Sequence, residues 1–400
     1  MLRQGHDKYT LPLFGLDHDN GQNSIFFVNG VASKTVKLTP RERALKQQAR
    51  VDKIQSLFDS HSSRLQSSQT HEAPPFAIDA VFTWVSNTAV DVLKRQQYEM
   101  QQPSGRPSDN ENNRYDDNDE LRYAIRSIYQ HAPWFRHIYI IVDDAQCPEW
   151  LIAASDTAPI PTIIVPHSFL YGEEFRDHLP TFNSHSIECH LHRIPGLSEQ
   201  FVYFNDDMYV NRSVPWSQFF GANGHPIYNF TGLVPTGPRH VTMTKHTIAW
   251  INNGTVLDQI FPNTSNSCRK YPAHQCIAML KSSFEQVWAN DTLCRYMTTT
   301  SRSRFRNTNN LYPIGFMCYW NIYTNHASEQ SYPTLFIQVT DDLDIYHLSN
   351  SILISNPALL CLNDGLQKKH TPSMQLVAML MSKLFPIPSP VEFTTSEGSL

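Results

Sequence analysis

The sequence predicts an α/β fold with a mainly parallel sheet flanked by helices. Three observations carry this prediction: short apolar runs of strand length, helical stretches between them, and an acid pair directly after the last run. The apolar runs lie at residues 77–84, 137–142, 161–165 and 201–204. Strands that alternate with helices pair mainly in parallel, and the helices cover both faces of the sheet. Such sheets bind their ligands at the carboxyl ends of the strands.

Residues 1–75 are predicted to form a helical appendage and a linker. Thr39, Pro40 and Glu42 fit a capping box, and the helix is expected to run to about Phe58. Its five cations leave two alternatives, a basic face that touches anionic lipid or a partner, and a solvated surface helix. The polar stretch 61–75 ends in Pro-Pro and is typical of a linker.

The next helices are predicted around a polar loop at 101–118. One helix is expected from Asp91 to about Tyr98, and another at 121–129, where apolar residues share one face and acidic residues precede the first turn. Arg122 and Arg126 lie four residues apart on another face. They either pair with Asp119 and its neighbours or point at a phosphate, and the second alternative makes them candidates for donor binding.

The strand at 201–204 ends in Asn205, Asp206 and Asp207. Mg²⁺ prefers carboxylate oxygens and binds together with substrate phosphates. Asp206 and Asp207 are therefore candidate metal ligands, and Asn205 is expected to orient them or the donor. The alternative is a turn in which these side chains only cap backbone groups.

A polar turn upstream, FNSHSIE, carries Asn183 and His185. Asn183 is expected to shape the turn or contact the donor. Helical spacing would place His185, Glu188 and His192 on one face, which allows a zinc site, although exposed histidines at this spacing are common. A histidine with a pKa near neutrality suits proton transfer or phosphate contact, which makes His185 a candidate catalytic residue.

The second half of the chain gives a weaker pattern. Residues 216–270 are loop-rich and are predicted to form an acceptor-side insertion within a domain that spans 76–385. A helix is expected at 272–288 and another around 376–380, before a Pro-rich tail at 386–400.

Composition excludes several classes of protein. The net charge of −5 argues against a nucleic-acid-binding protein. Seven cysteines without CxxC pairs suggest neither a zinc site nor a disulfide framework. The sequence has no apolar run of membrane-spanning length and no signal-peptide core at its start. These observations lead us to expect a cytoplasmic protein, with peripheral contact to the inner face of the plasma membrane left open.

Three long strings together resemble the Stealth family of sugar-1-phosphate transferases. They are IDAVFTWV at 78–85, ELRYAIRSIYQHAPWFRHIYIIVDDAQCPEWL at 120–151 and LPTFNSHSIECHLHRIPGLSEQFVYFNDDMYV at 179–210. The family includes bacterial capsule polymerases and the subunit that makes the mannose-6-phosphate tag on lysosomal enzymes. The resemblance implies a nucleotide-diphospho-sugar transferase-like, Rossmann-like sheet. The turns that follow 85 and 142 depart from the family pattern, so the base and donor-sugar preference cannot be copied.

Shorter strings resemble the later blocks of the same family: YPAH at 271–274, FRN at 305–307 and LLCLNDG at 359–365. The resemblance implies that His274 is a general base or phosphate ligand and that Arg306 is a charge clamp. Arg302 and Arg304 are near enough in sequence to take that second role. The resemblance also implies that Asp79 acts at the donor or catalytic centre and that Asp364 adds a metal ligand or holds the acceptor.

The expected reaction is transfer of hexose- or N-acetylhexosamine-1-phosphate from a UDP-sugar to a glycan hydroxyl. It would use Mg²⁺ or Mn²⁺, release UMP and build phosphodiester-linked capsular polysaccharide on an oligosaccharide or lipid-linked acceptor. Contact with a capsule-export complex and homo-oligomerisation stay open. The absence of long cysteine-rich insertions favours the bacterial type. The alternatives are an ordinary glycosyltransferase that releases UDP and a non-catalytic glycan-binding assembly subunit.

Overall fold

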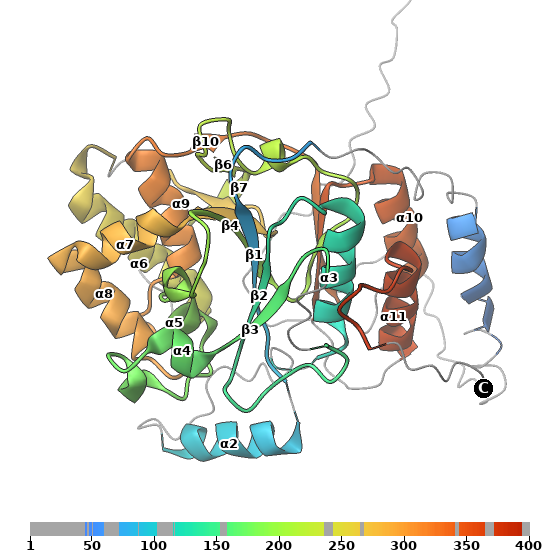
Figure 1. Ribbon diagram of the computed structural model, residues 1–400, viewed down its shortest axis with the longest axis horizontal. Helices are drawn as coiled ribbons and strands as arrows, with labels where there is room; N and C mark the ends of the chain where they lie inside the picture. The colour runs from blue at the N-terminus through green and yellow to red at the C-terminus, as the bar shows by residue number, and fades with distance from the viewer. Residues whose placement is uncertain are drawn as a thin grey trace, which may run out of the picture.

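A five-stranded sheet forms the centre of the computed structural model (Figure 1). Its strand order is β3-β2-β1-β4-β9, in which the first four strands are parallel and β9 pairs antiparallel with β4. The strands are β1 (Ile78–Thr83), β2 (Ile138–Val142), β3 (Thr162–Pro166), β4 (Gln200–Asn205) and β9 (Ile277–Leu280). The predicted α/β class is confirmed, and the four predicted apolar runs are the four parallel strands.

The structure describes most of the chain beyond residue 71. The described residues are 45, 48–49, 51–59, 72–86, 88–101, 115, 117–152, 158–235, 243–264, 268–340, 344–364 and 372–393. The predicted capping box at Thr39, Pro40 and Glu42 and residues 102–114 of the predicted loop at 101–118 lie outside these ranges. Among the described residues, no helix combines the length and apolar character needed to cross a bilayer.

Two helical layers enclose the central sheet, as the parallel strands require, because both of their faces are apolar. Figure 1 shows α3, α10 and α11 on one side and α5 to α9 on the other. Each side has its own hydrophobic core, one around Leu121 and Ile352 and the other around Phe284 and Phe316. The longer helices are α2 (Ala89–Met100), α3 (Glu120–His131), α6 (Lys245–Ile260), α7 (Lys281–Ala289), α8 (Asp291–Ser301), α9 (Pro313–Tyr323), α10 (Ile345–Ser355) and α11 (Pro372–Leu384).

A second sheet extends from the end of β4. After a turn, the chain forms β5 (Met208–Val210), which pairs antiparallel with β12 (Leu359–Asp364), and β12 pairs in parallel with β11 (Thr334–Val339). This sheet brings the string LLCLND at 359–364 beside the acid pair. The remaining short elements are α4 (His167–Tyr171), α5 (Ser184–Glu188), β6 (Ile227–Tyr228), β7 (Phe230–Leu233), β8 (Lys270–Pro272) and β10 (Ser328–Glu329).

The strand order creates a switch point between β1 and β4. From β1 the chain adds β2 and then β3 on one side, whereas β4 lies on the other side of β1. Thr83 pairs with Asn205 in register, so the ends of the first and fourth strands lie together. In open α/β sheets this is the place where ligands bind.

The predicted helix at 272–288 is wrong in its first half. Residues 277–280 form β9, whose four side chains are all buried against β4, and the helix α7 begins only at Lys281. A short, continuous apolar run cannot be assigned to helix or strand by periodicity, and here the exposed edge of β4 decided it. The loop-rich stretch 216–270 contains α6, whose Trp250 and Leu257 belong to a hydrophobic core.

The segments predicted as an N-terminal appendage and a C-terminal tail both contain residues that pack into the folded domain. Residues 51–59 are helical, and Ile54 and Phe58 are buried in the same core as α10 and α11. Lys53 lies over the ring of Tyr346, with its Nζ 3.6 Å from the ring centroid. At the other end, Val391 is fully buried and Glu392 is only 3% exposed. The folded unit therefore extends beyond the predicted limits of 76 and 385.

Candidate active site

The acid pair lies in the turn between β4 and β5, at the switch point of the sheet. Asp207 is buried, and its Oδ2 accepts a hydrogen bond of 3.1 Å from Asn363 Nδ2. The backbone N–H of Leu362 donates to the Asp207 carbonyl at 3.2 Å. The end of β12 therefore reaches the acid pair, as the resemblance implied for Asp364. The side chain of Asp364 itself lies outside the described part of the structure.

Negative charge accumulates around this turn. Burial raises the pKa of Asp206 well above its usual range, and the carboxylates of Asp207, Glu120 and Asp117 add to the effect. Burial likewise raises the pKa of Glu120 to about 8, although hydrogen bonds from Asn118 oppose it. Among the described residues, no lysine or arginine forms an ion pair with any of these four carboxylates. A divalent cation fits this arrangement, because it would offset the repulsion between the acids.

Glu120 and Asp117 were missed as members of the site. The acidic run at 116–120 predicted only a favourable interaction with the dipole of the following helix. The structure shows that the amino end of α3 also faces the acid pair, so its carboxylates act on the pKa of Asp206. No local signal distinguishes these two roles, since the second depends on how α3 packs against β5.

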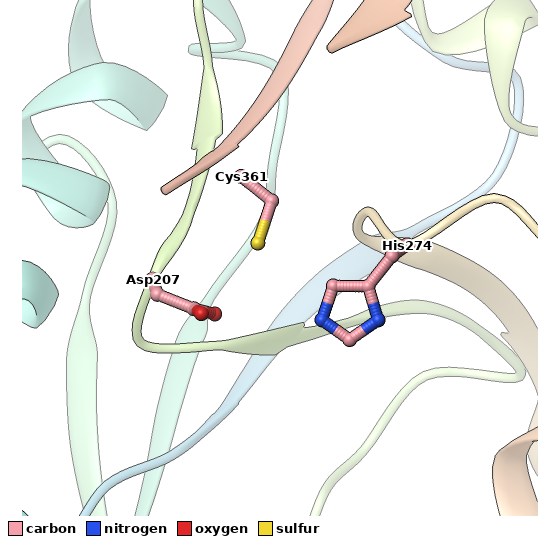
Figure 2. Close-up of side chains that lie close together, drawn as sticks. All are labelled: Asp207, His274 and Cys361. Carbon is pink, nitrogen blue, oxygen red and sulfur yellow. The ribbon is translucent and has the colours of Figure 1, made fainter. Parts of the chain in front are cut away.

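His274 comes from the short connection between β8 and β9 and points toward Asp207 (Figure 2). The two residues lie 67 positions apart in the sequence, yet their ligand atoms are within 4.8 Å of each other. The ring also makes an edge contact with Phe336 at 5.0 Å between centroids. The side chain keeps an exposed edge, but the surrounding protein desolvates the imidazolium and lowers the pKa of His274 despite the opposing effect of Asp207. A neutral imidazole is the form that a general base requires.

Three arginines in the string SRSRFRN have different partners. Arg304 donates to the backbone carbonyls of Asp177, Leu179 and Pro180, and Arg302 contacts His178 at 3.4 Å. Arg306 instead donates to the Ser184 hydroxyl at 2.8 Å. Within the described residues, it has no carboxylate at ion-pairing distance. Arg306 therefore differs from Arg304, which is held by three backbone carbonyls, and its role as a charge clamp stays a prediction.

The side chain of Asn183 shapes the turn before α5. Its Oδ1 accepts from the backbone N–H of His185 at 3.2 Å, and its Nδ2 donates to the Ser303 carbonyl at 2.9 Å and to Asn310 Oδ1 at 3.1 Å. This agrees with the first of the two roles expected for Asn183. The turn is thereby fixed to the segment that carries Arg306.

His185 is fully buried beneath His246. Its Nε2 lies 3.2 Å from His246 Nδ1, and His246 Nε2 accepts from the Trp250 indole at 3.3 Å. Because the indole can only donate, the neutral form of His246 carries its proton on Nδ1 and donates it to His185. His185 is therefore buried behind its contact with His246, which is partly exposed.

The three-residue zinc site considered for His185, Glu188 and His192 does not form. Helix α5 ends at Glu188, so the helical spacing does not continue to His192, whose ring stacks on Phe284 at 5.8 Å. Glu188 instead meets the hydroxyl of Tyr203, at 3.5 Å. Burial raises the pKa of Glu188 to about 8.

Tyr203 joins this group to the switch point. Its hydroxyl lies 3.0 Å from Thr83 Oγ1 and 3.1 Å from Asn205 Oδ1, in addition to its contact with Glu188. Asn205 is thus held at the carboxyl ends of β1 and β4, beside the acid pair that it was expected to orient. The sequence displayed Tyr203 only as an apolar strand residue, which concealed its hydroxyl contacts.

Asp79 does not lie at the carboxyl ends of the strands, where the acid pair is found. It pairs with Phe201 in register, four residues before the pair at Thr83, which places it about 13 Å away along the strand. Its carboxylate receives two hydrogen bonds from Arg136, at 2.6 and 2.9 Å, and one from the Ser198 backbone at 2.7 Å. Asp79 is fully buried in these contacts, so its predicted place at the catalytic centre is corrected to a structural one.

Arg122 and Arg126 also have a structural partner. Both bind Glu392, with Arg122 Nε at 2.7 Å and with Arg126 Nε and Nη2 at 2.8 and 2.6 Å. Arg122 additionally lies 4.0 Å from Asp119. The structure thus shows both arginines in ion pairs with carboxylates of the protein, which is the first of the two alternatives, and the donor-binding role stays a prediction. Their main partner lies more than 260 residues away in sequence and could not be read from the helix pattern.

The chain is similar in sequence to a known protein family and to several phosphotransferases. Residues 114–228 match the family model for Stealth protein CR2, conserved region 2. The chain is 32% identical to an exopolysaccharide phosphotransferase of Streptomyces coelicolor over 79% of its length. It is 30% identical to a capsular polysaccharide phosphotransferase of Aeromonas hydrophila over 78% of its length, and 29% identical to one of Streptococcus pneumoniae over 79%.

Coverage of these relatives differs. The chain spans 57% and 52% of the lengths of two Streptomyces coelicolor relatives, but 84% of the Aeromonas hydrophila protein and 99% of the Streptococcus pneumoniae protein. The matched conserved region contains α3, the turn at Asn183 and the acid pair. On the match to this region and on the extent of these similarities, the chain belongs to the Stealth family.

Proposed function

We propose that this chain transfers a hexose- or N-acetylhexosamine-1-phosphate from a UDP-sugar to a glycan hydroxyl in capsule or exopolysaccharide synthesis. The acceptor oxygen would attack the phosphorus next to the sugar, the bond between the two phosphates would break, and UMP would leave. The relatives described above are named as capsular or exopolysaccharide phosphotransferases, which supports this class of reaction.

The observation that carries the proposal is the meeting of Asp207 and His274 at the switch point. Diphosphate chemistry needs a cation to neutralise the donor, and acceptor attack needs a base for the hydroxyl proton. One residue suited to each task lies at the edge where α/β sheets bind ligands. A structural turn alone would not require a histidine from a distant segment beside the acid pair.

The residues divide the work as follows in this proposal. Asp206, Asp207 and Asp364 would hold Mg²⁺ or Mn²⁺, which supplies positive charge to the diphosphate, and Asn363 would keep the Asp207 carboxylate oriented. His274 would take the proton from the acceptor hydroxyl. Arg306 would stabilise negative charge that develops on the transferred phosphoryl group.

The His185–His246 pair is assigned a supporting role. His185 would fix the orientation and tautomer of His246. The His246 ring contacts Tyr312, which follows the segment that carries Arg306. This role resembles the way a second residue orients a functional imidazole in other sites. We also propose that residues 216–270 bind the acceptor.

The test is the identity of the nucleotide that leaves. The purified chain is incubated with a panel of UDP-sugars, Mg²⁺ and a capsule oligosaccharide primer, and the released nucleotides are separated. UMP from one donor is expected, with loss of about a hundredfold or more in rate in His274→Ala, the scale of a lost general base. UDP would indicate ordinary glycosyl transfer, and the absence of both turnover and donor binding would favour a glycan-binding subunit.

A further inference from the structure

Three side chains from distant segments converge beside the acid pair: Asp207, His274 and Cys361. Each offers one ligand atom, and the carboxylate oxygen, ring nitrogen and sulfur all lie within 4.8 Å of one another. Figure 2 shows the three side chains directed toward a common centre. Cys361 comes from β12 and is fully buried, and it pairs in register with Met208, the residue after Asp207.

An unsatisfied atom of Asp207 points to a ligand at this centre. Asp207 is 8% exposed, and among the residues that the structure describes its buried Oδ1 has no nitrogen or oxygen donor, with only the Cys361 thiol facing the carboxylate. Its Oδ2 is held by Asn363 at 3.1 Å. A buried carboxylate oxygen without a partner is unfavourable, and cation binding is one of the few ways to satisfy it. Asn363 meanwhile has the position of an outer residue that orients a metal ligand.

The three ligand atoms, an oxygen, a nitrogen and a sulfur, indicate which kind of cation the site would bind. Mg²⁺ takes oxygen ligands and does not select imidazole or thiolate, whereas Zn²⁺ is bound by cysteine, histidine and carboxylate. Three protein ligands with a fourth position left open form the arrangement of zinc sites that accept water or substrate. Such a site places its ligand atoms about 3.3–3.8 Å apart, so closure requires a movement of about 1 Å. The partly exposed His274 ring can provide it.

We infer that Asp207, His274 and Cys361 form a thiolate-containing site for Zn²⁺ or a cation of the same class. Binding forms bonds from the metal to oxygen, nitrogen and sulfur, and Cys361 releases its thiol proton to solvent. One consequence rests on the proposed function. Asp207 and His274 would be withdrawn from Mg²⁺ binding and proton transfer, so Zn²⁺ at this site would inhibit sugar-phosphate transfer.

The sequence did not indicate this site. The cysteines lack the CxxC spacing of a zinc motif, and Asp207, His274 and Cys361 are separated by 67 and 87 positions. Only the pairing of β5 with β12 and the short connection before β9 bring the three ligands together.

The test uses Co²⁺ as a spectroscopic probe on the full chain, with no activity measurement. Four-coordinate binding through a thiolate should give a sulfur-to-Co²⁺ charge-transfer band in the near ultraviolet and strong visible bands. Added Zn²⁺ should remove these bands, whereas excess Mg²⁺ should not. Cys361→Ser should abolish the charge-transfer band, and His274→Gln should weaken Co²⁺ binding by more than about a hundredfold, beyond the usual effect of an outer residue.

The matched control is Cys318→Ser, since Cys318 is also fully buried but lies in the other hydrophobic core. It should keep the full spectrum. His274 is at the surface, so His274→Gln tests the site even where replacement of a buried cysteine impairs folding. A wild-type spectrum without a charge-transfer band, or an unchanged band in Cys361→Ser or His274→Gln, would overturn the inference. Failure of sugar-phosphate transfer would leave these spectra unaffected, so the two proposals are tested separately.

Discussion

Replacing Glu392 with glutamine should destabilise the fold without directly damaging the site. The Glu392 side chain is 1% exposed and binds both Arg122 and Arg126. Glutamine keeps the shape of the side chain but removes its charge, which leaves Arg126 buried without a counter-ion. This change distinguishes the structural role of the two arginines from the phosphate-binding role that the helix pattern also allowed.

The pKa of Glu392 sets the size of the effect. Burial alone would raise this pKa, but hydrogen bonds from Arg126, the Ser389 backbone and Arg122 lower it to about 2, from an ordinary value of 4.5. A difference of about 2.5 pH units, at 1.36 kcal/mol for each, corresponds to about 3 kcal/mol. Losing one partner of other buried ion pairs costs about 3–5 kcal/mol, which is the same range.

The sign of the pH dependence follows from the lowered pKa. The stabilisation is fully present above about pH 4.5, where the unfolded carboxyl is also ionised, and it is lost as the pH falls through the folded value near 2. Urea unfolding should therefore show wild type about 3 kcal/mol more stable than Glu392→Gln at pH 7. The gap should narrow to about half of that at pH 3.

A surface ion pair provides the control. Lys270 and Glu329 lie 3.0 Å apart but are 48% and 52% exposed, so Glu329→Gln should cost less than about 1 kcal/mol. Suppose instead that Glu392→Gln unfolds like this control while the KM for the UDP-sugar changes markedly. The arginines would then serve the donor, and the structural assignment would be refuted.

Three further variants test the site and the folded limits of the chain. Asp207→Asn should lower metal-dependent turnover by about a hundredfold or more without lowering stability, and wild-type turnover that persists in EDTA would contradict the metal assignment. Arg306→Ala should lower kcat by about a hundredfold at unchanged stability, whereas Arg304→Ala should mainly lower the melting temperature, because Arg304 holds three backbone carbonyls. Ile54→Ala should lower the free energy of unfolding by about 2–5 kcal/mol, as measured in urea, and an unchanged value would mean that the helix at 51–59 is a detachable appendage.

The parallel strands could be predicted because their signal is local. Each centres on a short apolar run, and the runs at 138–142 in β2 and 201–204 in β4 are buried along their whole length, a need that is independent of their partners. The acid pair was also a local feature, since Asp206 and Asp207 directly follow the last of these runs. Strand β9 was misassigned because its apolar run fits a helix equally well until the open edge of β4 is known.

The sequence indicated some of the site residues, but it did not show which of them lie together. Family strings indicated Asp207, His274 and Arg306, and the structure brings Asp207 and His274 together. The same strings placed Asp79 at the catalytic centre, but the register of β1 with β4 puts it near the amino ends of these strands, opposite the acid pair. A motif marks a residue as important without saying whether it meets the substrate or another part of the chain.

The sequence by itself determined the α/β class, the four parallel strands and the position of the acid pair at a strand end. These features depend on the polarity and spacing of neighbouring residues. Only the tertiary structure decided that Glu392 holds Arg122 and Arg126, and that Cys361 lies beside Asp207 and His274. Such contacts join segments more than sixty residues apart, and they are fixed by strand pairing and helix packing rather than by any local pattern.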